Sequence, residues 1–209
     1  MTEGTGAGRP SRPKRAQVRA DIVSAATSAF ESAGYADTSV DAVAAAAGYT
    51  KGAVYSNFGS KPELFAEACA ERLTAISADL LERVAPVLDA GGERDELVRP
   101  LAEAVVAATL DTPLRWQLLL NEFRGVALRD PAVDAAYQKL SARRVAVLVE
   151  LLSSNAYLAR LAPAALQRSV LVLLTLVNAL ALEHAAAPET VDASTVTHIV
   201  AAFFDVVLP

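Results

Sequence analysis

The residue types best suited to chemistry gather between Thr38 and Phe65, and the chemistry they suit is the binding of phosphate groups and base edges. Lys51 and Lys61 fall in the first turns of two expected helices, where the helix dipole disfavours a cation. Local violations of this kind tend to mark function. A phosphate bound near those helix ends would reverse the sign of both costs. Tyr55 and Asn57 add a hydroxyl and an amide to the same segment.

Two short helices joined by a tight turn are expected to position these residues. Apolar residues at positions 40, 43, 44 and 47 recur with the spacing of one helix face. Thr38 or Ser39 is suited to cap the start of this helix, and Gly48 is suited to end it. A second helix of about two turns is expected from Thr50. This is the layout of a helix-turn-helix, whose second helix enters the DNA major groove by its N-terminal end.

The start of the second helix is the predicted reading end. Thr50, Lys51, Gly52 and Ala53 occupy it. We expect Lys51 to contact a guanine edge or a nearby phosphate, because both carry acceptors for a cation. Gly52 and Ala53 are small enough to keep the helix close to the bases, and Ala53 suits a thymine methyl.

The segment from Val18 to Phe65 resembles the DNA-binding domain of the tetracycline-repressor (TetR) family. The resemblance rests on Gly34-Tyr35, Thr38-Ser39-Val40, Ala47-Gly48, Lys51-Gly52-Ala53-Val54-Tyr55, Asn57-Phe58 and Ser60-Lys61. It implies that Tyr55, Asn57 and Lys61 contact phosphates together with Thr38 or Ser39. Such contacts position a protein on DNA but carry no direct sequence information. The resemblance further implies a homodimeric, ligand-responsive transcriptional regulator that binds a palindromic operator on double-stranded DNA.

Composition bounds the class of protein. The chain has 209 residues, 53% of them hydrophobic and 21% charged, which suits a folded protein with a sizeable core. Its net charge is −5, yet residues 1–20 hold five basic residues and one acidic residue. The basic region is therefore a short N-terminal segment, and the rest of the chain, which is acidic, should lie away from the DNA phosphates. The single cysteine, Cys69, excludes an intrachain disulfide and is expected to be a small buried hydrophobe in a reducing cytoplasm.

An enzyme is not expected, and neither is a metal or cofactor. The chain has two histidines, His184 and His198, at a spacing unlike a metal-binding motif. It has no nucleophile elbow, phosphate loop or paired-carboxylate signature. No signal peptide opens it, and its longest apolar run, 170–182, is too short to span a bilayer. We therefore expect a cytoplasmic protein without a membrane partner.

The chain reads as all-α, with about nine helices and no convincing β alternation. We expect a disordered basic tail over 1–13, a helix-turn-helix domain over 14–60 and a helical ligand-binding and dimerisation domain over 61–209. The tail is either featureless or an arginine arm that touches the minor groove or the backbone. Further signals are a capping box at Ser60 and Glu63, and a disturbance at Pro100 in a helix expected over 94–110.

The last two long helices carry more apolar surface than one side needs. Residues 170–182 are apolar nearly all round, which indicates burial on several faces. One interpretation is burial inside a single subunit. The family resemblance instead implies that these two helices pair with their copies in a four-helix dimer interface.

The C-terminal region is the candidate sensor. Trp116, Phe123, Tyr137 and Asn178 are the predicted ligand-binding residues, with the aromatic side chains lining an apolar cavity. Further candidate polar anchors are Arg115, Asn121, Glu122 and His184. The alternative is that the aromatic residues are core and the polar residues are surface.

For the whole chain, we expect a repressor released from DNA by a small, largely apolar ligand. A transcriptional activator, or a ligand-sensing helical protein without DNA function, is the alternative.

Overall fold

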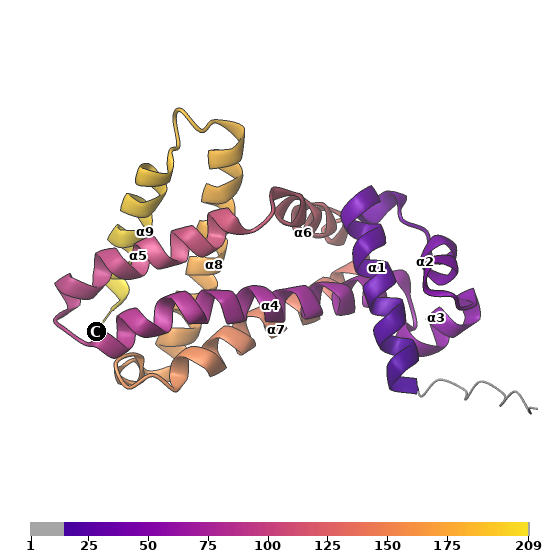
Figure 1. The fold of residues 1–209 in the computed structure, drawn as a ribbon, viewed down its shortest axis with the longest axis horizontal. Coiled ribbons are helices and arrows are strands. Elements are labelled where there is room, and N and C mark those ends of the chain that lie inside the picture. The colour runs from indigo at the N-terminus through magenta and orange to yellow at the C-terminus, as the bar shows by residue number, and fades with distance from the viewer. Residues whose placement is uncertain (1–14, 209) are drawn as a thin grey trace, which may run out of the picture.

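The computed structural model describes residues 15–208, and all regular structure in that range is helical, which confirms the predicted all-α class (Figure 1). The expected basic tail, 1–13, lies outside the described residues. In the described range nine α-helices and one short 3-10 turn follow one another: α1 Arg15–Asp37, α2 Val40–Ala47, α3 Lys51–Phe58, α4 Lys61–Ala90, α5 Arg94–Asp111, α6 Leu114–Ala127, α7 Pro131–Ser153, η1 Leu158–Arg160, α8 Pro163–Ala186 and α9 Ala193–Val207.

Local capping signals set the first three helices, which we call the head. Gly34 interrupts the helical path of α1 with φ 84° and ψ 172°, a conformation that favours glycine. Ser39 rather than Thr38 caps α2, since its Oγ accepts from the amide of Ala42 at 3.1 Å. Gly48 ends α2 in the left-handed conformation, and the Thr50 side chain then caps α3. The turn between α2 and α3 is therefore built as the sequence predicts.

The remaining helices form the body, with α4 as its spine. Figure 1 shows α4 running from the head to the opposite end of the molecule, while α8 and α9 lie on the side away from α1–α3. Helix α5 runs unbroken through Pro100, so the expected disturbance does not end it. Leu97 and Leu101 on either side of this proline are buried and hold the helix in place.

One hydrophobic core crosses the expected domain boundary after residue 60. It contains buried residues of α1–α4 together with residues of α6 and α7. Phe123 of α6 is fully buried among aromatic rings, with its centroid 4.3 Å from Phe65 and 4.8 Å from Tyr35. Tyr35 lies at the end of α1 and Phe65 at the start of α4. The head is therefore packed on α6 and does not stand as a separate core.

Helix α8 leaves an apolar surface uncovered. By length and composition alone it is the one helix of the described chain that could cross a membrane. Its most apolar 18-residue window has a mean hydropathy of 1.8. The expectation from 170–182 missed this, because the helix extends to 24 residues. Only 22% of that window is buried, and Leu171 and Val172 are each 50% exposed. A core helix of a soluble protein passes the same test of length and composition.

A carboxylate fixes the contact between head and body, and we call its surroundings the junction. The two Glu122 oxygens of α6 accept hydrogen bonds from the backbone amides of Tyr35 and Ala36, at 2.9 and 2.8 Å. A Cβ on Gly34 would lie 2.9 Å from the same carboxylate, so the close approach needs glycine there. Lys61 of α4 completes the junction: its Nζ donates to the Ala36 carbonyl at 3.0 Å and lies 4.6 Å from the centre of the Tyr35 ring.

Replacing Glu122 by alanine should destabilise the protein. The substitution leaves the Tyr35 and Ala36 amides without their charged acceptor, and hydrogen bonds to charged groups contribute about 1.5–3 kcal/mol each. We expect the free energy of unfolding in urea to fall by about 1.5–3 kcal/mol, since water replaces part of the loss. Glu71→Ala on the exposed side of α4 is the matched control and should change it by less than about 0.5 kcal/mol. Equal effects of the two substitutions would contradict the role of Glu122.

Candidate nucleic-acid interface and internal cavity

The start of α3 is the exposed end of the helix-turn-helix. Val54 and Phe58 are buried against the head core, which leaves the opposite face of α3 in solvent. Lys51 and Gly52 are exposed at the first turn, and Tyr55 is 42% exposed one turn later. This face combines a cation, a residue without a side chain and a phenol. It therefore suits close approach to a polyanion.

Lys51 is paired within the head. Its Nζ lies 2.7 Å from Asp41 Oδ2, and this hydrogen bond raises the pKa of Lys51. Asp41 lies in the first turn of α2, where an anion is favourable, so it offsets the unfavourable place of Lys51 in α3. The sequence argument placed a phosphate there instead. Both side chains are exposed, so Lys51 is free to exchange this carboxylate for a phosphate or a base edge.

Three residues expected to contact phosphate make hydrogen bonds within the protein. Thr38 is buried, and its hydroxyl donates to the Gly34 carbonyl at 2.6 Å. The side-chain amide of Asn57 donates to Ala53 O at 2.8 Å. Lys61 is held in the junction, where burial lowers its pKa. Thr38 is therefore inside the head, and Asn57 and Lys61 are half-buried at its surface. Exposed residues of the predicted interface are Ser39, Thr50, Lys51, Gly52 and Tyr55, with Ala53 half-buried between them.

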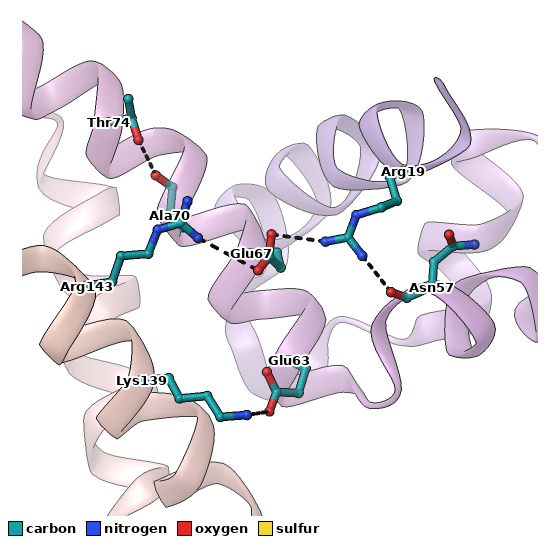
Figure 2. A network of polar contacts seen from close by, with 8 residues as sticks. All are labelled: Arg19, Asn57, Glu63, Glu67, Ala70, Thr74, Lys139 and Arg143. Carbon is teal, nitrogen blue, oxygen red and sulfur yellow. Dashed lines mark hydrogen bonds and ion pairs between the residues drawn. The ribbon is translucent and has the colours of Figure 1, made fainter. Parts of the chain in front are cut away.

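Arg19 of α1 holds α3 to α4, a role that the sequence argument missed because it counted Arg19 only as part of a basic end. Its guanidinium donates to the Asn57 carbonyl at 2.6 Å and pairs with Glu67 at 3.2 Å. It also lies 4.4 Å from the centre of the Phe58 ring. Figure 2 shows Arg19 between the end of α3 and the first turns of α4. Nothing local in the sequence signals contacts that span 38 and 48 residues.

Helix α7 joins the same network from the body (Figure 2). Arg143 lies 3.8 Å from the second oxygen of Glu67, and Lys139 Nζ lies 2.6 Å from Glu63 Oε1. The expected capping box is therefore half formed. Ser60 accepts from the Glu63 amide at 3.3 Å, but the Glu63 carboxylate binds Lys139. The first turns of α4 thus receive charged contacts from both α1 and α7.

A cavity that is partly open to solvent lies among α4, α5, α6, α7 and α8, and we call it the internal cavity. It has a volume of about 120 Å³, and its wall includes Trp116 and Asn178, two of the predicted ligand-binding residues. Phe123 is not part of this wall, because it is fully buried in the aromatic cluster at the junction. Tyr137 is half-buried and lines a small neighbouring cavity of about 20 Å³, which Asn178 also lines.

The other candidate anchors have separate places. Asn121 lines the small cavity and Glu122 is held at the junction. Arg115 is exposed, and His184 Nδ1 lies 2.7 Å from the Val191 carbonyl oxygen. Among residues 15–208 no group of three or more His, Cys, Asp or Glu is placed to hold a metal ion.

Residues 22–68 match the sequence profile of the bacterial regulatory proteins of the tetR family. No curated protein matches the chain. A structure from a Rhodococcus species, assigned to the TetR-family transcriptional regulators, is 18% identical and has a TM-score of 0.61 over 93% of this chain and 100% of its own. A transcriptional regulator from Streptomyces coelicolor A3(2) is 22% identical, with a TM-score of 0.64 over 90% and 98%. Bacillus subtilis FadR in complex with stearoyl-CoA is 12% identical, with a TM-score of 0.57 over 91% and 99%.

Substitutions of Lys51 and Asp41 should shift DNA affinity in opposite directions. Lys51→Ala removes the exposed cation of α3, and we expect it to weaken specific binding by about 5- to 150-fold and to relax base preference. Asp41→Asn frees Lys51 and should strengthen binding by up to about fivefold, because an exposed ion pair is weak. Fluorescence anisotropy with labelled duplex DNA measures both, and Glu71→Gln controls for net charge. Unchanged affinity in both variants would remove Lys51 from the interface.

Proposed function

We propose that this chain, whose residues 22–68 match the tetR family of bacterial regulatory proteins, is a homodimeric transcriptional repressor whose DNA binding responds to a small ligand. Members of this family are DNA-binding regulators rather than enzymes. The observation that carries the proposal is the helix-turn-helix of α2 and α3, with Lys51, Gly52 and Tyr55 exposed at the reading end. We place the protein in the cytoplasm, where its operator would be.

Homodimerisation through α8 and α9 is the second part of the proposal. An apolar helix with only 22% of its window buried needs a partner surface, and Leu171, Val172 of α8 and Val206 of α9 are large exposed hydrophobic residues. A second copy supplies the same surface by twofold symmetry. The dimer would present two α3 helices to half-sites about 34–36 Å, one helical turn, or a multiple of it, apart. A palindromic operator follows from that symmetry.

Ligand control is the third part of the proposal. The internal cavity is bounded by α4 and α6, the helices that contact the head, and by α7, which packs on both of them. A ligand that fits the cavity in only one arrangement of these helices shifts the population toward that arrangement. Movement of α4 would rotate the head and change the spacing of the two α3 helices in the dimer. Bacillus subtilis FadR, which has this fold, binds stearoyl-CoA, and FadR from Bacillus halodurans, also of this fold, is a fatty acid degradation regulator. Both support an apolar ligand.

Two alternatives differ from this proposal in a measurable way. An activator of the same fold would bind the same kind of operator but raise transcription. A ligand-sensing helical protein without DNA function would bind a small molecule but protect no DNA. The exposed reading end of α3 favours DNA binding over the second alternative, and repression is proposed because covering promoter DNA needs no further contact with the polymerase.

Footprinting on the DNA upstream of its own gene, across a salt series, tests the proposal. We expect protection of a palindrome, with an affinity that falls steeply with salt because phosphate contacts release counterions. If no upstream site is protected at low salt, selection from random duplexes distinguishes a distant operator from a protein without DNA function. Failure to enrich any palindrome from random DNA would overturn the proposed function.

A charge on the exposed face of α8 should separate the two copies. Leu171→Glu introduces a carboxylate where the proposed interface is apolar, and we expect a monomer in sedimentation equilibrium together with a loss of operator binding of at least about tenfold. Leu128→Glu is the matched control, since Leu128 is 83% exposed between α6 and α7. A Leu171→Glu protein that remains dimeric would place the interface elsewhere.

A further inference from the structure

A second, apolar cavity adjoins the internal cavity. It has a volume of about 80 Å³, and α9 contributes Phe203, Phe204 and Val207 to its wall. Six residues line both cavities: Leu80, Val105, Leu148, Leu152, Val170 and Leu173. The only polar side chains on the wall of the second cavity are two serine hydroxyls, those of Ser77 and Ser169. We call the first cavity the polar chamber and the second the apolar chamber.

An arginine without a carboxylate partner faces the polar chamber. Arg144 of α7 lines this chamber and the small cavity that also contains Tyr137. Its Nε is buried and has no hydrogen-bond partner among the described residues. Neither wall includes an Asp or a Glu. Burial lowers the pKa of Arg144, although an arginine keeps its charge at neutral pH. The neighbouring arginine, Arg143, differs, since it pairs with Glu67.

Two further buried polar atoms on the same wall lack partners. The indole N–H of Trp116 has no acceptor, and the side-chain oxygen of Gln117 has no donor, although the Gln117 amide donates to the Thr109 carbonyl at 3.2 Å. Asn178 lies on the wall of both this chamber and the small cavity. The polar chamber therefore offers a cation and an indole donor beside amide groups. Donors of this kind suit an anionic acceptor.

A half-buried arginine with an unpaired Nε is unfavourable for folding, because its charge is partly desolvated without a compensating anion. A bound anion would remove that cost and satisfy the arginine and indole donors together. A volume of about 120 Å³ is far above the roughly 10–15 Å³ that a single water needs, so the chamber has room for a ligand head group. The apolar chamber beyond it has no group to hold a second charge.

We propose that the ligand of this protein is an amphipathic carboxylate, with its head group at Arg144 and Trp116 and its hydrocarbon tail in the apolar chamber toward α9. This rests on the proposed function only for the consequence of binding, namely release from DNA. The binding itself depends on the chambers alone. Helix α7 carries Arg144 into the chamber and Lys139 and Arg143 onto α4, so the head group contacts the helix that also contacts the start of α4.

Trp116 is the only tryptophan of the chain and reports the proposed site directly. Straight-chain alkanoates from hexanoate to dodecanoate are titrated against its fluorescence, each beside the primary alcohol and the alkyl phosphate of the same length. We expect saturable binding of an alkanoate, with the matched alcohol at least about tenfold weaker, as loss of one charge-assisted hydrogen bond predicts. Tighter binding of the alkyl phosphate would overturn the carboxylate head group.

Arg144→Gln keeps a polar side chain but removes the charge. We expect it to lower alkanoate affinity at least about tenfold, to leave alcohol affinity unchanged within about twofold, and to raise the melting temperature of the free protein. Arg99→Gln, on the exposed side of α5, is the matched control. Equal binding of alcohol and alkanoate by the natural protein would overturn the proposal. So would an unchanged preference in Arg144→Gln, or no fluorescence change with any compound.

DNA binding is measured on the same preparations, so that the two proposals fail separately. A protein that protects a palindrome but binds no alkanoate keeps the proposed function and loses the ligand. A protein that binds an alkanoate through Arg144 but enriches no DNA keeps the ligand and loses the proposed function.

Discussion

The contact of the Glu122 carboxylate with two backbone amides at the end of α1 is the constraint on which the arrangement of head and body depends. The amides of Tyr35 and Ala36 become available because Gly34 turns the chain out of the helix. The adjacent Phe123 then fills the space between Tyr35 and Phe65. A directional charged contact and a fully buried ring thus come from consecutive residues of α6. Together they fix the position and the angle of the head on the body.

The charged network at the start of α4 acts beside this junction. Arg19 holds α3 to α4 from the head, while Lys139 and Arg143 hold α7 to the same turns from the body. These ion pairs are exposed, so each is weak alone and open to rearrangement. That is a suitable property for a contact that would rearrange in the proposed response to a ligand. The buried Phe123 ring and the two hydrogen bonds of Glu122 stabilise the contact between head and body. The exposed ion pairs allow the start of α4 to shift relative to its neighbours.

The helices and their limits could be predicted from the sequence because their signals are local. Ser39, Gly48 and Thr50 lie within a few residues of the helix ends that they define, and each acts as its residue type predicts. The partners of the charged side chains could not be predicted in this way. Glu63 has capping-box spacing, yet its carboxylate binds Lys139, 76 residues away.

Two further side chains show the same limit. Phe123 is predicted to line a ligand cavity but packs into the junction, since only the folded chain brings Tyr35 and Phe65 beside it. Thr38 resembles a surface cap in sequence but is buried, because the turn at Gly34 directs its hydroxyl inward. Two polar residues of the cavity wall, Trp116 and Asn178, could be predicted from the sequence. Gln117 and Arg144 of the same wall lie on helices whose sequence patterns do not indicate that these side chains face a cavity.

Amide hydrogen exchange at the junction tests most directly whether the head is held by the body. We expect the amides of Tyr35 and Ala36 to open together with α6, at nearly the free energy of global unfolding. We also expect Glu122→Ala to lower their protection far more than that of α5 and α9. Exchange of these amides at low free energy in the natural protein, unaffected by Glu122→Ala, would contradict the account, because the head would then move independently of the helices that line the cavity.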